Sequence, residues 1–244
     1  DEKGLRNSTI GKQLGFLKWF LKWSANNGYH KNMAYLSFKP KLKTTEKRII
    51  FLTWDELMTV YNFPIPESKK YLDRVRDVFC FCCFTSLRYS DVYNLKRFDI
   101  KNGALHITTV KTADSLTIDL NKYSQAILDK YDGVPFEDNK ALPVISNQKM
   151  NDYIKELGQL CGLDQPETVT YYVGNERVDE VYPKYELMGT HTGRRTFISN
   201  AIMMGIPPQV VMKWTGHSDY KAMKPYIAIA DSAKAEAMKL FNEK

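Results

Sequence analysis

The chain of 244 residues has few cysteines and no long apolar run. Cys80, Cys82 and Cys83 crowd one apolar stretch, and Cys161 stands apart, which is the spacing of neither a zinc site nor a redox pair. The densest apolar run, VFCFCCF at 78–84, falls well short of the ~18–20 residues that a membrane-spanning helix requires. These features predict a buried helix with free thiols, in a protein of a reducing cytoplasm.

Acidic residues are also in short supply relative to basic ones. The chain has 35 Lys and Arg against 28 Asp and Glu, for a formal net charge of +7. Such a balance favours polyanionic partners, nucleic acid first and an anionic membrane second. With 43% hydrophobic and 13% aromatic residues, the chain is not a disordered protein. Its length suits one large domain, or one domain with an appendage.

The N-terminal part predicts one helix followed by a basic linker. Apolar residues recur at helical spacing over 8–27, with Ser8 available as N-cap and Gly28 as a stop. The stretch 31–48 is rich in lysine and reads as a linker. Because a single helix does not make a domain, we expect residues 1–30 to be the end of a truncated helical domain.

The remaining residues, 49–244, mix helices with short antiparallel strands. We expect helices over 54–62, 68–85, 122–131, 147–161, 191–204, 207–214, 219–226 and 231–242. Alternation with period two predicts a small antiparallel sheet over 98–119 and a hairpin over 168–181 that turns at Gly174. The fold class is therefore α+β, mainly α with a small antiparallel β-sheet.

Two basic side chains stand at predicted turns. Arg88, in TSLRYSD, follows the apolar helix and has Asp91 three residues on, which a surface ion pair explains equally well. Lys111, in VKTAD, lies at a hairpin tip, where a solvated lysine is the ordinary interpretation. Neither residue predicts a function by itself.

The HTGRRTF motif places His191 and Arg194 on one face of a predicted helix. Both lie in its first turn, where the free N–H groups and the helix dipole favour an anion. The planar guanidinium fits phosphate oxygens. A capping histidine and a surface arginine are the alternative for this motif alone. Arg195 faces elsewhere on the helix, so we expect it to be structural or to contact a backbone phosphate.

The segment WTGHSDYKAMKPY adds a histidine and a tyrosine. His217 follows Gly216 at the end of a short predicted helix, and Tyr226 comes nine residues later. The chain has only four histidines, and two of them fall in these motifs. His30 and His106 have no such neighbours, and we expect them to be structural.

The order of these groups, Arg, Lys, His-x-x-Arg, Gly-His and Tyr, resembles that of the tyrosine recombinases, the integrases of phages and mobile elements. HTGRRTFISNAI and the YYVGNERVDE hairpin are similar to integrases of Bacteroides-type elements. The resemblance implies a catalytic domain over 49–244 and, in 1–30, the C-terminal part of a helical core-binding (SAM-like) domain. Ser86 stands where the family often has Gly, and Gly193 where it often has Leu. Neither departure removes a functional group.

The resemblance implies a site-specific recombinase that cuts and rejoins DNA through a covalent 3'-phosphotyrosine intermediate. It carries over six catalytic residues: Arg88, Lys111, His191, Arg194, His217 and Tyr226. The arginines and His217 would stabilise negative charge on the phosphate, His191 would act as the base, and Lys111 would protonate the leaving 5' oxygen. The arginines would do the electrostatic work of a metal, so no metal or other cofactor is expected.

The expected partner is double-stranded DNA at recombination sites, in the bacterial cytoplasm at the nucleoid, with no membrane. Lys41, Lys43 and Arg195 are candidate DNA contacts. In this family a helix such as 231–242 often docks on a neighbouring protomer, which implies a homo-tetramer on DNA, with accessory DNA-bending or excisionase proteins as further partners. Two alternatives stay open: a type IB topoisomerase-like relaxing enzyme, and a non-catalytic DNA-binding accessory protein of the same fold.

Overall fold

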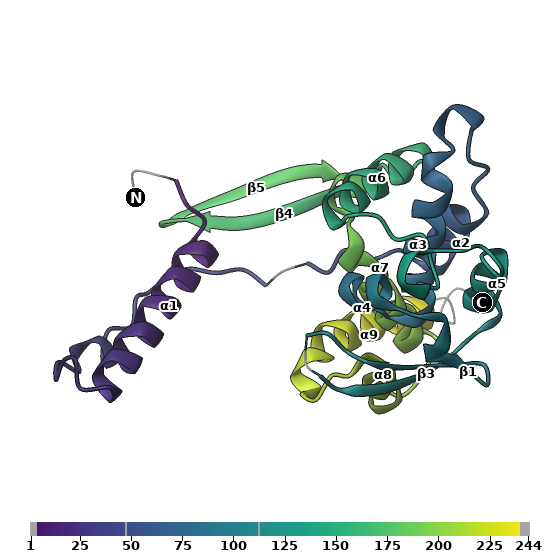
Figure 1. Ribbon diagram of the computed structural model, residues 1–244. Coiled ribbons are helices and arrows are strands. Elements are labelled where there is room, and N and C mark those ends of the chain that lie inside the picture. The colour runs from purple at the N-terminus through teal and green to yellow at the C-terminus, as the bar shows by residue number, and fades with distance from the viewer. Residues whose placement is uncertain (1–3, 47, 112, 240–244) are drawn as a thin grey trace. The chain divides into compact units, whose positions relative to one another are not determined.

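The computed structural model describes residues 4–46, 48–111 and 113–239, with side chains as far as Asp231. The chain forms two compact units, each described by itself (Figure 1). The first unit comprises Asp1–Arg48 and Pro166–Tyr182, and the second comprises Ile49–Gln165 and Pro183–Lys244. None of the described helices combines the length and apolar character needed to cross a bilayer.

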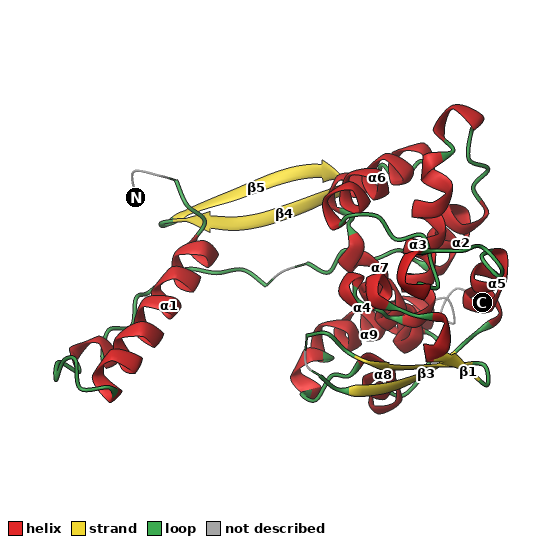
Figure 2. Cartoon of the chain, in the orientation of Figure 1, coloured by secondary structure: helices red, strands yellow, loops and turns green. Residues whose placement is uncertain are grey.

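The first unit is built on helix α1 (Asn7–Asn26) and a hairpin of strands β4 (Pro166–Val173) and β5 (Glu176–Pro183) (Figure 2). Helix α1 starts after Arg6, whose side chain makes no cap hydrogen bond, so Ser8 is not the N-cap that the sequence suggests. The described residues of the expected linker, 31–46 and 48, are irregular apart from one 3-10 turn, Ala34–Leu36.

The hairpin belongs to the first unit because its tip and one edge are bound there. Asn7, only 2% exposed, donates from Nδ2 to Gly174 O at 2.8 Å and accepts from Gly174 N at 2.9 Å. The hydroxyl of Thr45 donates to Thr170 O at 2.8 Å. The sequence placed the hairpin within the 49–244 domain. The structure differs, since these bonds join it to segments at the other end of the sequence.

The second unit is mainly helical. Its α-helices are α2 (Trp54–Asn62), α3 (Tyr71–Thr85), α4 (Tyr89–Asn94), α5 (Lys122–Lys130), α6 (Asn147–Leu160), α7 (Thr190–Met203), α8 (Pro208–Thr215) and α9 (Lys224–Lys239). Single 3-10 turns occur at Glu67–Lys69, Arg97–Asp99, Glu137–Asn139, Lys184–Leu187 and Tyr220–Ala222. Thr53 and Glu56 cap α2 reciprocally. Strands β1 (Ile100–Lys101), β2 (Ala104–Thr108) and β3 (Ser115–Asp119) form the predicted antiparallel sheet in the order β1-β2-β3.

Helix α3 forms the centre of the core. Its residues from Asp77 to Thr85 are all buried, including the three cysteines of the apolar run. Helix α7 packs directly along α3 (Figure 1), and a Cβ added at Gly193 of α7 would lie 2.9 Å from the Cβ of Cys82. The absence of a side chain at Gly193 therefore allows the two helices to approach this closely.

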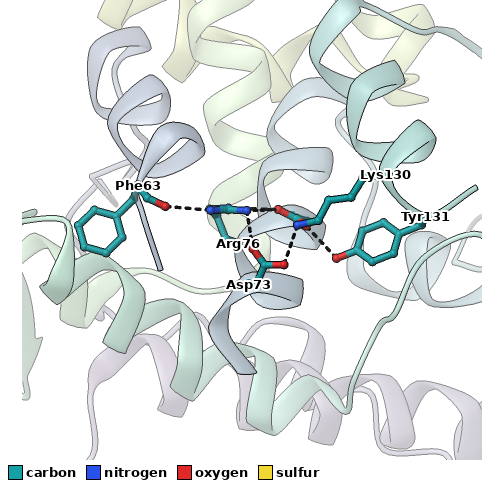
Figure 3. A network of polar contacts seen from close by, with 6 residues as sticks. Phe63, Asp73, Arg76, Lys130 and Tyr131 are labelled. Carbon is teal, nitrogen blue, oxygen red and sulfur yellow. Dashed lines mark hydrogen bonds and ion pairs between the residues drawn. The ribbon is translucent and has the colours of Figure 1, made fainter. Parts of the chain in front are cut away.

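A polar network joins the N-terminal half of α3 to the end of α5 (Figure 3). Asp77, in α3, accepts hydrogen bonds at Oδ2 from Lys130 Nζ at 2.6 Å and from the Tyr131 hydroxyl at 2.8 Å. Its other oxygen accepts from Arg76 at 3.0 Å. Burial and the negative charge of Asp77 raise the pKa of Tyr131, which stays a hydrogen-bond donor. The network pairs the buried carboxylate of Asp77, which would lower the stability of the fold if it had no partner.

The C-terminal region differs from the two helices expected over 219–226 and 231–242. A 3-10 turn, Tyr220–Ala222, occupies much of the first range. One helix, α9, then begins at Lys224 and covers the described residues of the second range. Pro225 occupies its first turn, where the missing N–H costs nothing. Most of the expected docking segment, namely the side chains after Asp231 and residues 240–244, lies outside the described part of the chain.

Candidate active site

Arg88 is presented by a strained turn between α3 and α4. Ser86 ends α3 with φ 65° and ψ 7°, a left-handed conformation that explains why glycine is common at this position. Arg88 then caps α4 with extended backbone. Its Nη1 atom is buried, has no hydrogen-bond partner among the described residues, and lies 3.8 Å from Asp91 Oδ2. The guanidinium therefore retains an unused donor.

Asp91 connects this turn to the one that carries Lys111. The Asp91 side chain is 2% exposed, and its Oδ1 accepts the backbone N–H of Val110 at 3.0 Å. Lys111, the next residue along the β2–β3 turn, is exposed. The buried Asp91 carboxylate thus binds both Arg88 and the β2–β3 turn that carries Lys111.

Arg194 lies almost fully inside the second unit, at 3% exposure. Its Nη1 donates to Ser86 O at 3.0 Å, and its Nη2 donates to Thr215 O. Burial, together with the positive charge of Arg88, lowers the pKa of Arg194 to about 10. A guanidinium that stays charged while losing solvent is well placed to stabilise an anion.

His217 follows the end of α8. Gly216 terminates that helix with φ 65°, and an added Cβ there would lie 3.3 Å from Leu116. His217 Nδ1 is 2.8 Å from the Thr215 hydroxyl, and Nε2 is 3.4 Å from Arg194 Nη2. Burial lowers the pKa of His217 to about 4, with further lowering by Arg194 and two other site residues.

The pKa of His191 shows that several cations lie around its side chain. It lies in the first turn of α7, and its side chain reaches the surface. Loss of solvent is the largest cause that lowers the pKa of His191 to about 4, followed by the positive charges of Arg195, Arg194, Arg88 and Lys111. Four cations drawn from three separate segments therefore act on one imidazole, which is neutral at pH 7.

The model of the phage integrase family matches residues 50–233, three quarters of the chain. The chain belongs to the phage integrase family. It is a site-specific tyrosine recombinase, an enzyme that cuts and rejoins DNA.

Individual relatives agree with this assignment. Tyrosine recombinase XerC of Thermodesulfovibrio yellowstonii is 23% identical over 234 residues, which cover 92% of this chain and 72% of the relative. A structure of the Tn1549 transposon integrase with circular-intermediate DNA has a TM-score of 0.62 at 18% identity, covering 97% of this chain and 80% of that one. DNA-bound lambda integrase has a TM-score of 0.61 at 16% identity, covering 87% and 71%. At these identities the solved structures show a shared fold.

Tyr226 lies in the first turn of α9 of this recombinase. It is half-buried and packs against the small apolar cluster around Ile198 and Val211. Burial raises the pKa of Tyr226, and the positive charges of Arg195 and Arg194 oppose that rise. The phenol is consequently protonated at neutral pH and lies within electrostatic reach of the α7 arginines.

Arg195 differs from the sequence-based expectation. Among the neighbouring charges, that of Arg195 has the largest lowering effect on the pKa values of both His191 and Tyr226. The side chain of Arg195 therefore lies beside the candidate site and does not face away from it. Helical periodicity contains this signal, because His191 and Arg195 are four residues apart and so share a helix face. The expectation had compared Arg195 only with its neighbour Arg194. The sequence reading also overlooked Thr215, which contacts both Arg194 and His217. Its position two residues before His217 was the available signal.

The other candidate DNA contacts lie in the first unit of the recombinase. Lys41 and Lys43 are both exposed. The Lys43 ammonium is 5.8 Å from the centre of the Tyr172 ring, and the Lys43 carbonyl accepts a hydrogen bond from Asn7 at 3.0 Å. The backbone of this basic segment is therefore held while its lysine side chains stay accessible.

Proposed function

We propose that the recombinase cleaves one strand of double-stranded DNA by attack of the Tyr226 hydroxyl on a phosphodiester. The new phosphorus–oxygen bond makes a 3'-phosphotyrosine, and the bond to the 5' oxygen breaks. The observation that carries this proposal is the convergence of Arg88, Lys111, Arg194 and Arg195 on His191. That concentration of positive charge suits a phosphate that gains negative charge in its transition state.

Arg88 and Arg194 would hold the non-bridging oxygens of the phosphate. Within the part of the chain that the structure describes, the buried Nη1 of Arg88 lacks a hydrogen-bond partner, so an entering phosphate oxygen would satisfy it. Arg194 is fixed by the carbonyls of Ser86 and Thr215, which limits reorganisation during the reaction. Planar guanidiniums match the geometry of phosphate oxygens. We propose His217 as a further donor to the same oxygens.

Two proton transfers complete the proposed step. Tyr226 is protonated in the free protein, and the neutral His191 accepts its proton as the phenol attacks. Lys111 gives a proton to the departing 5' oxygen. The energy of the broken bond is kept in the phosphotyrosine, so a 5'-hydroxyl of another strand can displace the tyrosine and rejoin DNA. Neither a metal nor another cofactor takes part in this scheme.

The proposed assembly uses both units of the chain. Residues 1–30 would form part of a core-binding domain, and the 31–48 linker would contact DNA phosphates through Lys41 and Lys43. We propose a homo-tetramer on DNA, linked through residues 231–242, with accessory DNA-bending proteins as further partners in the bacterial nucleoid. A lambda integrase structure described as a tetramer bound to a Holliday junction supports this arrangement.

Replacement of Tyr226 by phenylalanine tests the proposed nucleophile. The probe is a duplex carrying the ends of the mobile element, nicked so that the cleaved fragment diffuses away and the adduct accumulates. Wild type should form a covalent adduct in the presence of EDTA. Tyr226→Phe should bind the duplex with unchanged affinity and form none, because it lacks the attacking oxygen. Gel electrophoresis and mass spectrometry of the modified peptide measure the adduct.

Tyr220→Phe is the matched control, since Tyr220 is nearby in the sequence and exposed. It should form adduct at the wild-type rate. Adduct formation by Tyr226→Phe would show that another residue attacks. Relaxation of supercoiled plasmids without any specific site would indicate a topoisomerase, and binding without cleavage would indicate an accessory protein.

A further inference from the structure

Thr215, the last residue of α8, touches two of the proposed functional side chains at once. It is fully buried, at 0% exposure. Its carbonyl accepts from Arg194 Nη2, and its hydroxyl oxygen lies 2.8 Å from His217 Nδ1. The direction of the second hydrogen bond decides which nitrogen of the His217 ring carries the proton.

The hydroxyl of Thr215 has a single hydrogen, and that hydrogen is already engaged. The oxygen lies 2.9 Å from the carbonyl of Val211 and 3.3 Å from that of Met212, both of which can only accept. Only lone pairs are left to face the imidazole. His217 Nδ1 must therefore carry the proton and donate it to Thr215.

The other side of the ring leads independently to the same tautomer. His217 Nε2 lies 3.4 Å from Nη2 of Arg194, a group that has donors and no acceptor. A hydrogen on Nε2 would point at a second hydrogen. The neutral ring therefore presents a bare lone pair at Nε2, toward Arg194.

We infer that Thr215 is a positioning residue that holds His217 in its Nδ1–H tautomer, so that His217 donates from Nε2 to a phosphate only after it takes up a proton. This inference rests on the proposed role of His217 as a donor. The proton comes from solvent and joins the Nε2 lone pair, while the Nδ1–H bond to Thr215 is kept. The product is an imidazolium with one hydrogen for Thr215 and one for the phosphate.

The charged surroundings keep the ring neutral until an anion arrives. Burial is the largest cause that holds the pKa of His217 at about 4, followed by Arg194 of α7, Arg88 of the turn before α4, and His191 of α7. His191 is neutral in the pH range of the test, so the positive charges around the ring are those of the two arginines. A bound phosphate or sulfate opposes these positive charges and raises the pKa of the ring. Between the free and bound pKa values, anion binding takes up one proton. Affinity then falls by up to about tenfold for each unit of rising pH.

The first test measures the tautomer directly by long-range ¹H–¹⁵N NMR of the whole ¹⁵N-labelled chain at pH 7. His217→Gln identifies the His217 signals by their disappearance. We expect the shift of a protonated nitrogen at Nδ1 and of a bare nitrogen at Nε2. A proton on Nε2 would overturn the inference, whatever the outcome of the Tyr226 adduct experiment, because this measurement requires no catalysis.

The second test follows the same signals while sulfate is added between pH 5 and pH 8. Sulfate is a suitable probe because it does not titrate in this range. We expect sulfate to convert His217 to the imidazolium and to bind less tightly as pH rises. Thr215→Val removes the acceptor with little change of shape and should lower the pKa of the sulfate-bound ring by about one unit.

Thr215→Ser keeps the hydroxyl and should restore the wild-type titration, which a purely structural role for Thr215 would not require. Sulfate binding that leaves His217 neutral, or identical titrations of the valine and wild-type chains, would refute the inference. If Thr215→Val fails to fold, the wild-type tautomer and the Thr215→Ser titration decide.

Discussion

Asp91 shows how one buried side chain can organise several segments of the candidate active site. One carboxylate oxygen pairs with Arg88 and the other accepts the N–H of Val110, next to Lys111. The anion also counters the effect of neighbouring positive charge on the pKa of Arg194. A neutral amide could preserve the hydrogen bond to Val110 but not the ion pair. The charge and the hydrogen-bonding capacity of Asp91 can therefore be separated experimentally.

Asp91→Asn should slow covalent adduct formation by roughly 10- to 100-fold, because a loosened Arg88 no longer meets the phosphate in the required geometry. DNA binding should change much less, since most contacts to the duplex involve other phosphates. Single-turnover cleavage of the nicked duplex measures the rate. Asp129→Asn, on the exposed face of α5, is the control and should leave it unchanged. Equal rates for both variants would count against the positioning role of Asp91.

At the scale of elements, the contact between α3 and α7 determines where the His-x-x-Arg motif lies. Gly193 is between the two candidate catalytic residues of that motif, and a Cβ added there would meet Cys82 and Cys83 across the contact. A leucine at this position, common elsewhere in the family, would require a wider separation of the helices. The glycine that replaces the family's common leucine at position 193 therefore fits the close approach of α3 to α7.

Gly193→Ala should destabilise the second unit by about 1–3 kcal/mol, because the added methyl group would lie 2.9 Å from the Cβ of Cys82 and the packed helices would have to shift to relieve the overlap. Urea unfolding followed by circular dichroism measures the change. Gly15→Ala in α1 is the matched control, since nothing lies within 4 Å of its added Cβ. There the better helix propensity of alanine should stabilise α1 by about 0.5–1 kcal/mol. A Gly193→Ala protein as stable as wild type would contradict this account of the helix contact.

At the scale of the whole molecule, the chain passes between the two units three times, after residues 48, 165 and 182. The β4–β5 hairpin carries the acidic residues Glu167 and Glu180, which form ion pairs with Arg48 at 2.9 Å and with Arg6 at 3.3 Å. The hairpin is therefore an integral part of the N-terminal unit, although its sequence interrupts the second unit.

Asn7→Ala should release the hairpin tip, because it removes three hydrogen bonds from a buried position. We expect hydrogen exchange of the Gly174 amide to accelerate by roughly 30- to 1000-fold, which corresponds to about 2–4 kcal/mol of local opening. Exchange within α3 and α7 should be unaffected. Asn27→Ala, at the exposed end of α1, is the control and should leave Gly174 protected. Unchanged exchange at Gly174 in Asn7→Ala would show that other contacts hold the hairpin.

The sequence alone determined the features that depend on neighbouring residues. Apolar periodicity identified most helices to within a few residues, the antiparallel sheet followed from alternation, and the turn at Gly174 was correctly located. The order of the motifs gave the family. Local periodicity and turn chemistry are set by interactions over a few residues, which a linear reading contains.

Only the tertiary structure decided which distant segments meet. It assigned the hairpin to the N-terminal unit through Asn7, brought the charges of Arg88 and Lys111 to act on His191, and set Arg194 against the Thr215 carbonyl. Each of these outcomes depends on packing, burial or charge contributed by residues far apart in the chain, and these forces act through space with no trace in local sequence pattern.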